Sequence, residues 1–246
     1  MITLSLQHTL TPWHQAGMQV LAILARKGGV GKSMLARALA VQALTQGKRA
    51  AILDADPQGT VLAWRARRPH PAPHVVGLGN RAMADVLREI ESGGGDIALI
   101  DTPPHAQPII SKAAELADAA LIVTGTGPED IEQIRAVYDI VSNLRKPAGI
   151  VINKTKPNTA ALKAARGGVL AFSMPVCPTD ITDRVVHPYA SANGLSVQET
   201  DPEGRAAIEI GEVWEWLVTR VLSSESATTP SHDNTRTRPR HTRIPA

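Results

Sequence analysis

The sequence predicts one α/β domain, a doubly wound and mostly parallel sheet with helices on both faces. Three observations predict it: short unbroken apolar runs typical of buried parallel strands, segments between them with apolar residues at helical spacing, and a glycine-rich loop after the first run. The chain has 246 residues, enough for one substantial core, and no internal repeat suggests a second.

The elements are expected in alternating order. The first strand is expected at 20–25 (VLAILA), and the helix after it at 34–44, where Gly47 stops it. A helix at 128–144 begins with a proline and carries two acids in its first turn, as the helix dipole favours. Further strands are expected at 49–54, 96–101, 120–124 and 149–153, and residues 213–222 form the last helix. Its apolar residues at helical spacing are expected to face the core: Trp214, Trp216, Leu217, Val218 and Val221.

The glycine-rich loop reads KGGVGKS at residues 27–33. Glycines between a strand and a helix let backbone N–H groups turn inward around phosphate oxygens, at the positive end of a helix. Lys32 would reach the β and γ phosphates, and the Ser33 hydroxyl would bind Mg²⁺. The loop therefore predicts a nucleotide site formed by Gly28, Gly29, Val30, Gly31, Lys32, Ser33 and Met34.

Acidic residues follow two of the expected strands. The second strand ends in DADPQG at residues 54–59, and the strand at 96–101 ends in DTPP. Ligands of parallel α/β folds lie beyond the carboxyl ends of the strands, so these acids are expected to face the phosphates. We expect Asp56 to orient the attacking water, Asp54 to support the magnesium shell, and Asp101 to be the second magnesium-side acid, reaching Ser33 through a water. Aspartates at strand ends are also common helix caps, which is the alternative.

The loop departs from the usual phosphate-loop pattern, because Arg26 stands five positions before Gly31 and Lys27 supplies an additional lysine. In this it resembles the deviant Walker A loop of the family that includes the ParA partition ATPases, the MinD division-site ATPases and the nitrogenase iron protein. The resemblance covers roughly residues 20–222. It implies slow, Mg²⁺-dependent ATP hydrolysis by a homodimer with ATP sandwiched between the subunits. It also implies that Lys27 reaches the partner's phosphates and that the second aspartate of the motif, Asp56, is the hydrolytic one.

Composition narrows the branch of the family. The single Cys177 cannot supply the paired cysteines that bridge an iron–sulfur cluster, and it fits a reducing cytoplasm. A MinD-like chain would end in a basic amphipathic membrane helix, whereas the residues after 222 lack an apolar face, so we expect no membrane binding. Only 19 residues precede the first strand, too few for a helix-turn-helix. The chain thus most resembles the small plasmid ParA proteins.

That resemblance implies a nucleoid-associated protein that binds DNA without sequence preference, with hydrolysis stimulated by a ParB-like centromere-binding partner. The basic residues proposed to contact DNA are Lys163, Arg166 and Arg184, each of which could instead be a solvated surface charge. Asn153 would contact the base or simply form a turn, and in the family Pro178 would form the other wall of the base pocket.

The two ends and one internal segment are expected to lack regular structure. Residues 1–18 show no pattern, and Met18 offers a second candidate start. Residues 223–246 form a basic tail, which holds +2 of the net charge of +3 and has too few apolar residues to order itself. Arg65, Arg67 and Arg68, followed by PHPAPH, are interpreted as a solvated linker, with a nucleotide-sensing partner contact as the alternative.

Three functions are compatible with these features. The first is an ATP-dependent switch that segregates plasmid or chromosomal DNA. The alternative is the same switch used to position a protein cargo or the division machinery, and the sequence does not choose between these two. A biosynthetic ATP-dependent ligase on the same fold is the third, disfavoured because no substrate pocket besides the phosphate site is indicated.

Overall fold

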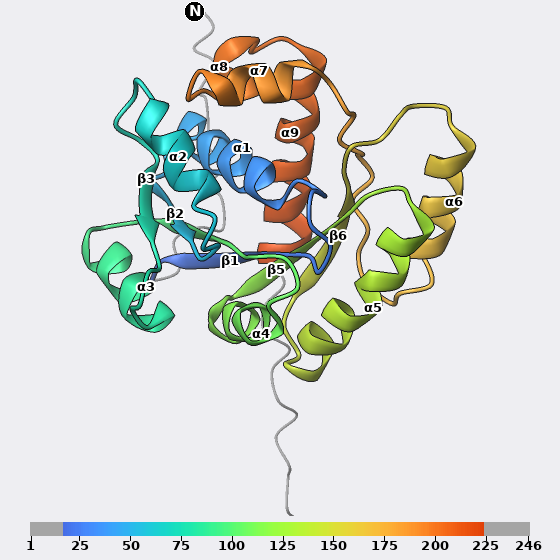
Figure 1. The fold of residues 1–246 in the computed structure, drawn as a ribbon, viewed down its shortest axis with the longest axis horizontal. Helices are drawn as coiled ribbons and strands as arrows, with labels where there is room; N and C mark the ends of the chain where they lie inside the picture. The colour runs from blue at the N-terminus through green and yellow to red at the C-terminus, as the bar shows by residue number, and fades with distance from the viewer. Residues whose placement is uncertain (1–16, 224–246) are drawn as a thin grey trace, which may run out of the picture.

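A computed structural model describes residues 17–223, and the predictions for the N-terminal extension and the basic tail fall almost entirely outside this range (Figure 1). The core is a six-stranded sheet in the order β3-β2-β4-β1-β5-β6, with every pair parallel. The strands are β1 (Gln19–Leu24), β2 (Ala50–Asp54), β3 (His74–Gly77), β4 (Ile97–Asp101), β5 (Ala119–Thr124) and β6 (Ala148–Ile152). The predicted fold class is confirmed.

Two layers of helices cover the sheet (Figure 1). On one face lie α1 (Lys32–Thr45), α2 (Thr60–Arg67), α7 (Val186–Ala192), α8 (Val197–Thr200), α9 (Arg205–Trp216) and the π-helical turn η1 (Leu217–Leu222). On the other lie α3 (Met83–Ser92), α4 (Gln107–Leu116), α5 (Pro128–Asn143) and α6 (Ala160–Val169). Strands β1, β2, β4, β5 and β6 are buried on both faces, and their sequences are runs of apolar residues instead of alternating ones. Their polar residues stand at strand ends: Gln19, Asp54, Asp101 and Thr124.

The sheet order places the functional segments together. Strand β1 lies in the middle, with β4 on one side and β5 on the other, and Ile23 pairs with both Asp101 and Leu121. Asp54 of β2 pairs with Asp101 of β4. The loops that follow these strands therefore leave the sheet at one edge, where parallel α/β proteins bind ligands.

Three predictions about elements need correction. The strand β3 was not predicted, and it makes the strand at 97–101 the fourth along the chain. Arg65 and Arg67 belong to α2 and Arg68 follows directly, so this segment is not a linker; Arg68 is 7% exposed. The last helical segment begins at Arg205, well before 213, while its buried Trp214, Leu217 and Val221 confirm the predicted core-facing side.

Among residues 17–223, no helix combines the length and the apolar character needed to cross a membrane.

Candidate functional site

The loop between β1 and α1 has the backbone geometry of a phosphate cradle. Gly29 and Gly31 have φ values of 76° and 101°, which residues with a Cβ rarely adopt. Gly31 caps α1, so the unpaired N–H groups at the positive end of that helix face the loop. Both residues were predicted from the motif, and the left-handed backbone explains why glycines occupy the two positions.

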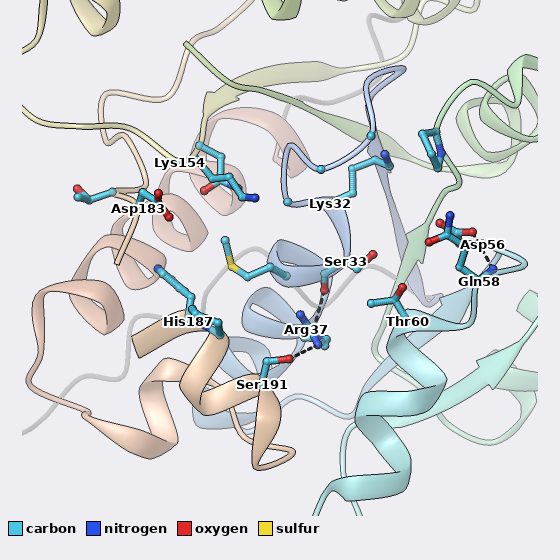
Figure 2. A pocket seen from close by; sticks show the side chains of 18 residues that line it. Lys32, Ser33, Arg37, Asp56, Gln58, Thr60, Lys154, Asp183, His187 and Ser191 are labelled. Atoms are coloured by element: carbon cyan, nitrogen blue, oxygen red, sulfur yellow. Dashed lines mark hydrogen bonds between the residues drawn. The ribbon is translucent and has the colours of Figure 1, made fainter. Parts of the chain in front are cut away.

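A cavity of about 520 Å³ opens over this loop, a size typical of small-molecule sites (Figure 2). It brings together eight of the predicted residues: Gly28, Gly29, Gly31, Lys32, Ser33, Met34, Asp56 and Asn153. The other lining residues were not predicted: Arg37, Gln58, Thr60, Pro104, Lys154, Thr182, Asp183, His187, Pro188 and Ser191. Most of these come from α2 and α7 or the loops before them, which only the fold brings to the phosphate loop.

Lys32 is a buried cation at the base of this cavity. It is 6% exposed, and burial lowers the pKa of its ammonium, although Asp101 and Asp56 oppose that shift. Its Nζ makes one long contact of 3.4 Å, to the main-chain oxygen of Lys27. The ammonium can therefore bind further acceptors, such as phosphate oxygens.

Asp101 is the most perturbed acid of the site. Burial raises its pKa to about 7, and the neighbouring carboxylates of Asp54 and Asp56 act in the same direction, whereas the Ser33 hydroxyl and Lys32 lower it. Neither carboxylate oxygen has a hydrogen-bond partner of good geometry within residues 17–223. Orphaned oxygens next to a serine hydroxyl fit a hydrated Mg²⁺, with Ser33 as a direct ligand and Asp101 accepting from a water.

The two aspartates of DADPQG have different environments. Asp54 accepts the N–H groups of Val61 and Leu62 at 3.0 Å each and that of Asp56 at 3.2 Å. Asp54 thus accepts from N–H groups in the first turn of α2, whose N-cap is Gly59, and its role beside magnesium stays a prediction. Asp56 lines the cavity and accepts one bond, from the Gln58 N–H at 3.0 Å (Figure 2). Asp56 is thus the acid of this motif that can reach a reacting water.

Lys27 points away from the cavity toward the start of α5. Its ammonium lies 2.7 Å from Asp130 and 3.5 Å from Glu129. The hydrogen bond with Asp130 raises the pKa of Lys27, so the group is cationic near neutral pH. The structure therefore pairs this lysine within its own chain, at the edge of the phosphate loop.

The two residues predicted for the base pocket, Asn153 and Pro178, have different relations to the cavity. Asn153 is fully buried, donates to the Val30 oxygen at 2.7 Å and leaves its own oxygen unpaired, so it supports the loop and is not a surface turn. Pro178 does not line the cavity; its carbonyl accepts a bond from Arg166 instead. On the side of Lys154, the cavity is also lined by Thr182, Asp183 and His187 (Figure 2).

The predicted DNA-contacting residues are not equally available. Arg166 pairs with Asp180 at 2.9 Å, and Arg184 pairs with Glu209 at 2.8 Å, so both charges are compensated within the chain. Lys163 is exposed on α6, and no ion pair within residues 17–223 involves it. The positive charge available to phosphates at Arg166 on α6 and at Arg184 beside α9 is therefore smaller than the sequence suggested.

Arg37 is the functional-site residue that sequence reasoning missed most clearly. Burial lowers its pKa to about 10, with Arg67 adding to the shift and Asp101 opposing it. The sequence carries a signal, because Arg37 interrupts the apolar run LARALAV at residues 35–41, and all seven of these residues are buried in the structure.

Comparison with known proteins agrees with this geometry. Residues 21–194 match the family described as the CobQ/CobB/MinD/ParA nucleotide binding domain. The chain is 27% identical over 202 residues to the maintenance of carboxysome distribution protein A of Halothiobacillus neapolitanus, covering 78% of this chain and 93% of that protein.

Two solved structures share the fold. One is the septum site-determining protein MinD of Pyrococcus horikoshii complexed with Mg-ADP, with a TM-score of 0.65 at 17% identity, covering 81% of this chain and 96% of that one. The other is a putative plasmid partition protein of Borrelia burgdorferi bound to AMPPNP, with a TM-score of 0.62 at 16% identity, covering 80% and 97%.

Proposed function

We propose, since the chain belongs to the family of CobQ/CobB/MinD/ParA nucleotide binding domains, that it is a Mg²⁺-dependent ATPase that acts as a dimeric switch to position a protein cargo. The observation that carries the proposal is the cavity over the phosphate loop, in which Lys32, Ser33 and Asp56 converge. Relatives of this fold bind Mg-ADP and AMPPNP, which supports ATP as the nucleotide.

The residues of the cavity divide the chemistry among them. The N–H groups of the loop and the Lys32 ammonium would hold the phosphates, and Ser33 and Asp101 would hold Mg²⁺, which would supply positive charge against the phosphates. Asp56 orients the water for attack on the γ phosphorus. The rate of hydrolysis then depends on whether the phosphates, the metal and the water oriented by Asp56 are all in place.

Dimerisation is the step that Lys27 would control. In the single chain its ammonium is occupied by Asp130 and Glu129. In the proposed ATP dimer it leaves these acids and reaches the phosphates bound by the other subunit. The switch would therefore exchange an ion pair within one subunit for one between subunits, when ATP supplies the acceptor.

The sequence similarity to the carboxysome distribution protein of Halothiobacillus neapolitanus supports cargo positioning over DNA segregation. The carboxysome distribution protein is matched over 93% of its length, so the likeness is not confined to the phosphate loop. DNA segregation with a ParB-like partner is the second candidate, supported by the fold shared with a plasmid partition protein. Non-specific DNA binding at the nucleoid serves both, because each needs a surface on which the dimer can travel.

The test combines a biochemical and a cellular measurement. In light scattering, the Asp56→Ala variant is expected to accumulate as an ATP-dependent dimer. The Lys32→Ala variant, which also introduces alanine but removes the phosphate-binding ammonium, is expected to remain monomeric. Wild-type protein should hydrolyse Mg-ATP slowly, and both variants should not. Absence of turnover and of the Asp56→Ala dimer would overturn the switch.

The cellular arm separates the two candidate roles. Deletion of the gene is expected to leave plasmid and chromosome retention unchanged over many generations. A retention defect in the deletion strain would instead support DNA segregation, and a gel-shift titration with ATP or ADP would then show whether DNA binding follows the nucleotide state.

A further inference from the structure

Arg37 is a buried cation at the edge of the nucleotide cavity that has no acidic partner. It is 9% exposed and lines the cavity together with Ser33 and Ser191 (Figure 2). Across residues 17–223 no ion pair joins it to a carboxylate. Arginine is rarely buried unless paired, because removing the guanidinium from water is costly. In the empty protein this charge is balanced only in part, by the more distant carboxylates of Asp101 and Asp54 and by the face of the Trp64 ring, 5.8 Å from the guanidinium carbon.

The two hydrogen bonds of Arg37 join separate parts of the site. Its Nε donates to the main-chain oxygen of Ser33 at 3.0 Å, on the turn of α1 that contains the candidate magnesium ligand. Its Nη1 donates to the hydroxyl of Ser191, on α7, at 2.7 Å (Figure 2). A single side chain thus connects the phosphate-binding turn to the opposite wall of the cavity.

The same part of α7 is held from α2. Arg67 donates to the Ser191 oxygen at 3.4 Å, Arg68 to the Gly194 oxygen at 3.0 Å, and the Trp64 indole to the Leu195 oxygen at 3.0 Å. The packing is close enough that a Cβ on Gly194 would lie 2.5 Å from the backbone of Arg67. Residues 191–195, which we call the α7 turn, are therefore fixed to two helices that both begin at the cavity.

We propose that Arg37 is a positioning residue of the nucleotide site: bound phosphates compensate its buried charge, and its bonds to Ser33 and Ser191 pass the resulting stabilisation to α7. This inference rests on the proposed nucleotide binding. Phosphates enter the cavity that Arg37 lines, and they bring several negative charges into a region from which water is partly excluded. Coupling of this kind is reciprocal, so a fixed α7 also favours a bound nucleotide.

The experiment compares Arg37→Met with the wild-type chain, with and without Mg-ADP. Methionine keeps much of the length and removes the charge and both bonds. The thermal midpoint of the empty variant should equal or exceed that of the wild type, because a buried charge that the empty protein balances only in part is gone. Its affinity for Mg-ADP should fall roughly tenfold, the scale of one screened charge interaction inside a protein. Hydrogen exchange of residues 186–195, slowed by Mg-ADP in the wild type, should no longer respond.

Three further variants separate the effect of the Arg37 charge from the effect of its hydrogen bond to α7. Ser191→Ala keeps the charge and should retain most of the affinity while losing the slowed exchange of α7. Arg37→Lys keeps the charge but cannot make both bonds, so it should behave like Ser191→Ala, and it serves if Arg37→Met fails to fold. Arg65→Met removes an arginine of α2 that does not line the cavity and whose hydrogen bond goes to the Pro71 oxygen, so it should leave the affinity for Mg-ADP unchanged.

A purely structural role predicts the opposite pattern. The empty Arg37→Met protein would then unfold at a lower temperature, with an unchanged affinity for Mg-ADP and unchanged slowing of exchange in α7. That result would overturn the inference while leaving nucleotide binding intact. A wild-type protein that Mg-ADP does not stabilise would overturn the proposed function, and this inference with it.

Discussion

The ammonium of Lys27 lies 2.7 Å from the carboxylate of Asp130, whose other oxygen accepts the Gly127 N–H at 2.9 Å. One acid thus caps α5 and holds the lysine of the phosphate loop. Lys27 is about one third exposed and Asp130 much less so, which places the pair at the protein surface, next to the loop. Any role of Lys27 in another subunit requires this pair to separate.

The Lys27–Asp130 pair gives the first prediction. Asp130→Asn keeps a capping oxygen but removes the charge that retains the lysine, so the ATP-dependent dimer should form at lower ATP concentration. Lys27→Gln should weaken both the dimer and hydrolysis. Light scattering and phosphate release check both, with Glu129→Gln as the control, since Glu129 lies farther from Lys27 and is exposed. A Lys27→Gln variant with normal turnover and assembly would show that the lysine has no cross-subunit role.

The second prediction concerns the contact between Gly31 and Asn153. A Cβ at Gly31 would lie 2.0 Å from the Asn153 nitrogen, and its φ of 101° is itself unfavourable for alanine. Gly31→Ala should therefore lower the free energy of unfolding by about 1–3 kcal/mol and weaken nucleotide binding. Chemical denaturation and Mg-ADP titration measure the two effects.

Gly29→Ala is the matched control for Gly31→Ala. Its φ is 76°, but a Cβ there meets nothing within 4 Å, so only the backbone cost of about 1 kcal/mol applies. Equal losses of stability in the two variants would mean that the Asn153 contact has no energetic role.

The third prediction is a pH dependence from Arg68 and Glu199. Arg68 is 1% exposed in its side chain and pairs with Glu199 at 2.6 Å. Burial alone would raise the pKa of Glu199, but the bonds from Arg68 and from the Ser196 N–H outweigh it and leave the pKa below its usual 4.5. The pair therefore stabilises the fold fully above pH 4.5, and the contribution is lost as the pH falls toward the folded-state pKa.

Glu199→Gln tests this pair by urea unfolding across the acidic range. The variant should lose about 2–3 kcal/mol near neutral pH, because a buried guanidinium loses its charged partner, and its stability should vary less with pH. Glu115→Gln in the exposed pair with Lys112 should cost under about 1 kcal/mol. If both variants behave alike, the burial of Arg68 does not strengthen its pair.

The fourth prediction concerns Cys177. Burial raises the pKa of this thiol to about 12, so it stays protonated and unreactive in the folded chain. An alkylating reagent at about pH 8 should label the native protein very slowly and the denatured protein at once. Because the sequence has one cysteine, mass spectrometry gives the labelled fraction directly. Fast labelling of native protein would mean that the segment around Cys177 opens readily.

The sequence predicted what depends on local pattern. Buried parallel strands are apolar throughout, so five of the six were recognisable, and the glycine and lysine spacing of the loop identified the phosphate site. Strand β3 was missed because it has four residues, begins at the last histidine of PHPAPH and lies at the edge of the sheet, where none of its side chains is fully buried. The short helix α2 was missed because it buries only Val61 and Trp64.

The other wall of the site could not be predicted, for a physical reason. Helix α7 packs against α1 and α2, and this packing brings His187, Pro188 and Ser191 to the cavity. Arg37 and Ser191, which form a hydrogen bond there, are more than 150 positions apart in the sequence. Nothing in the segment around them has a local pattern that marks a binding site. The ion pairs of Arg166 and Arg184 could not be predicted for the same reason, because the acids that pair with them lie on other segments and become neighbours only in the fold.

The order of strands also determines when the site can exist during synthesis. Strand β1 pairs with β4 and β5 and not with β2, so the strand that carries the phosphate loop has no neighbour in the sheet until the chain has grown past residue 97. The residues of α7 that line the cavity are synthesised later still, because α7 begins at Val186. An emerging chain on the ribosome therefore exposes an apolar strand for most of its first half, and it acquires the complete cavity only near the end of translation.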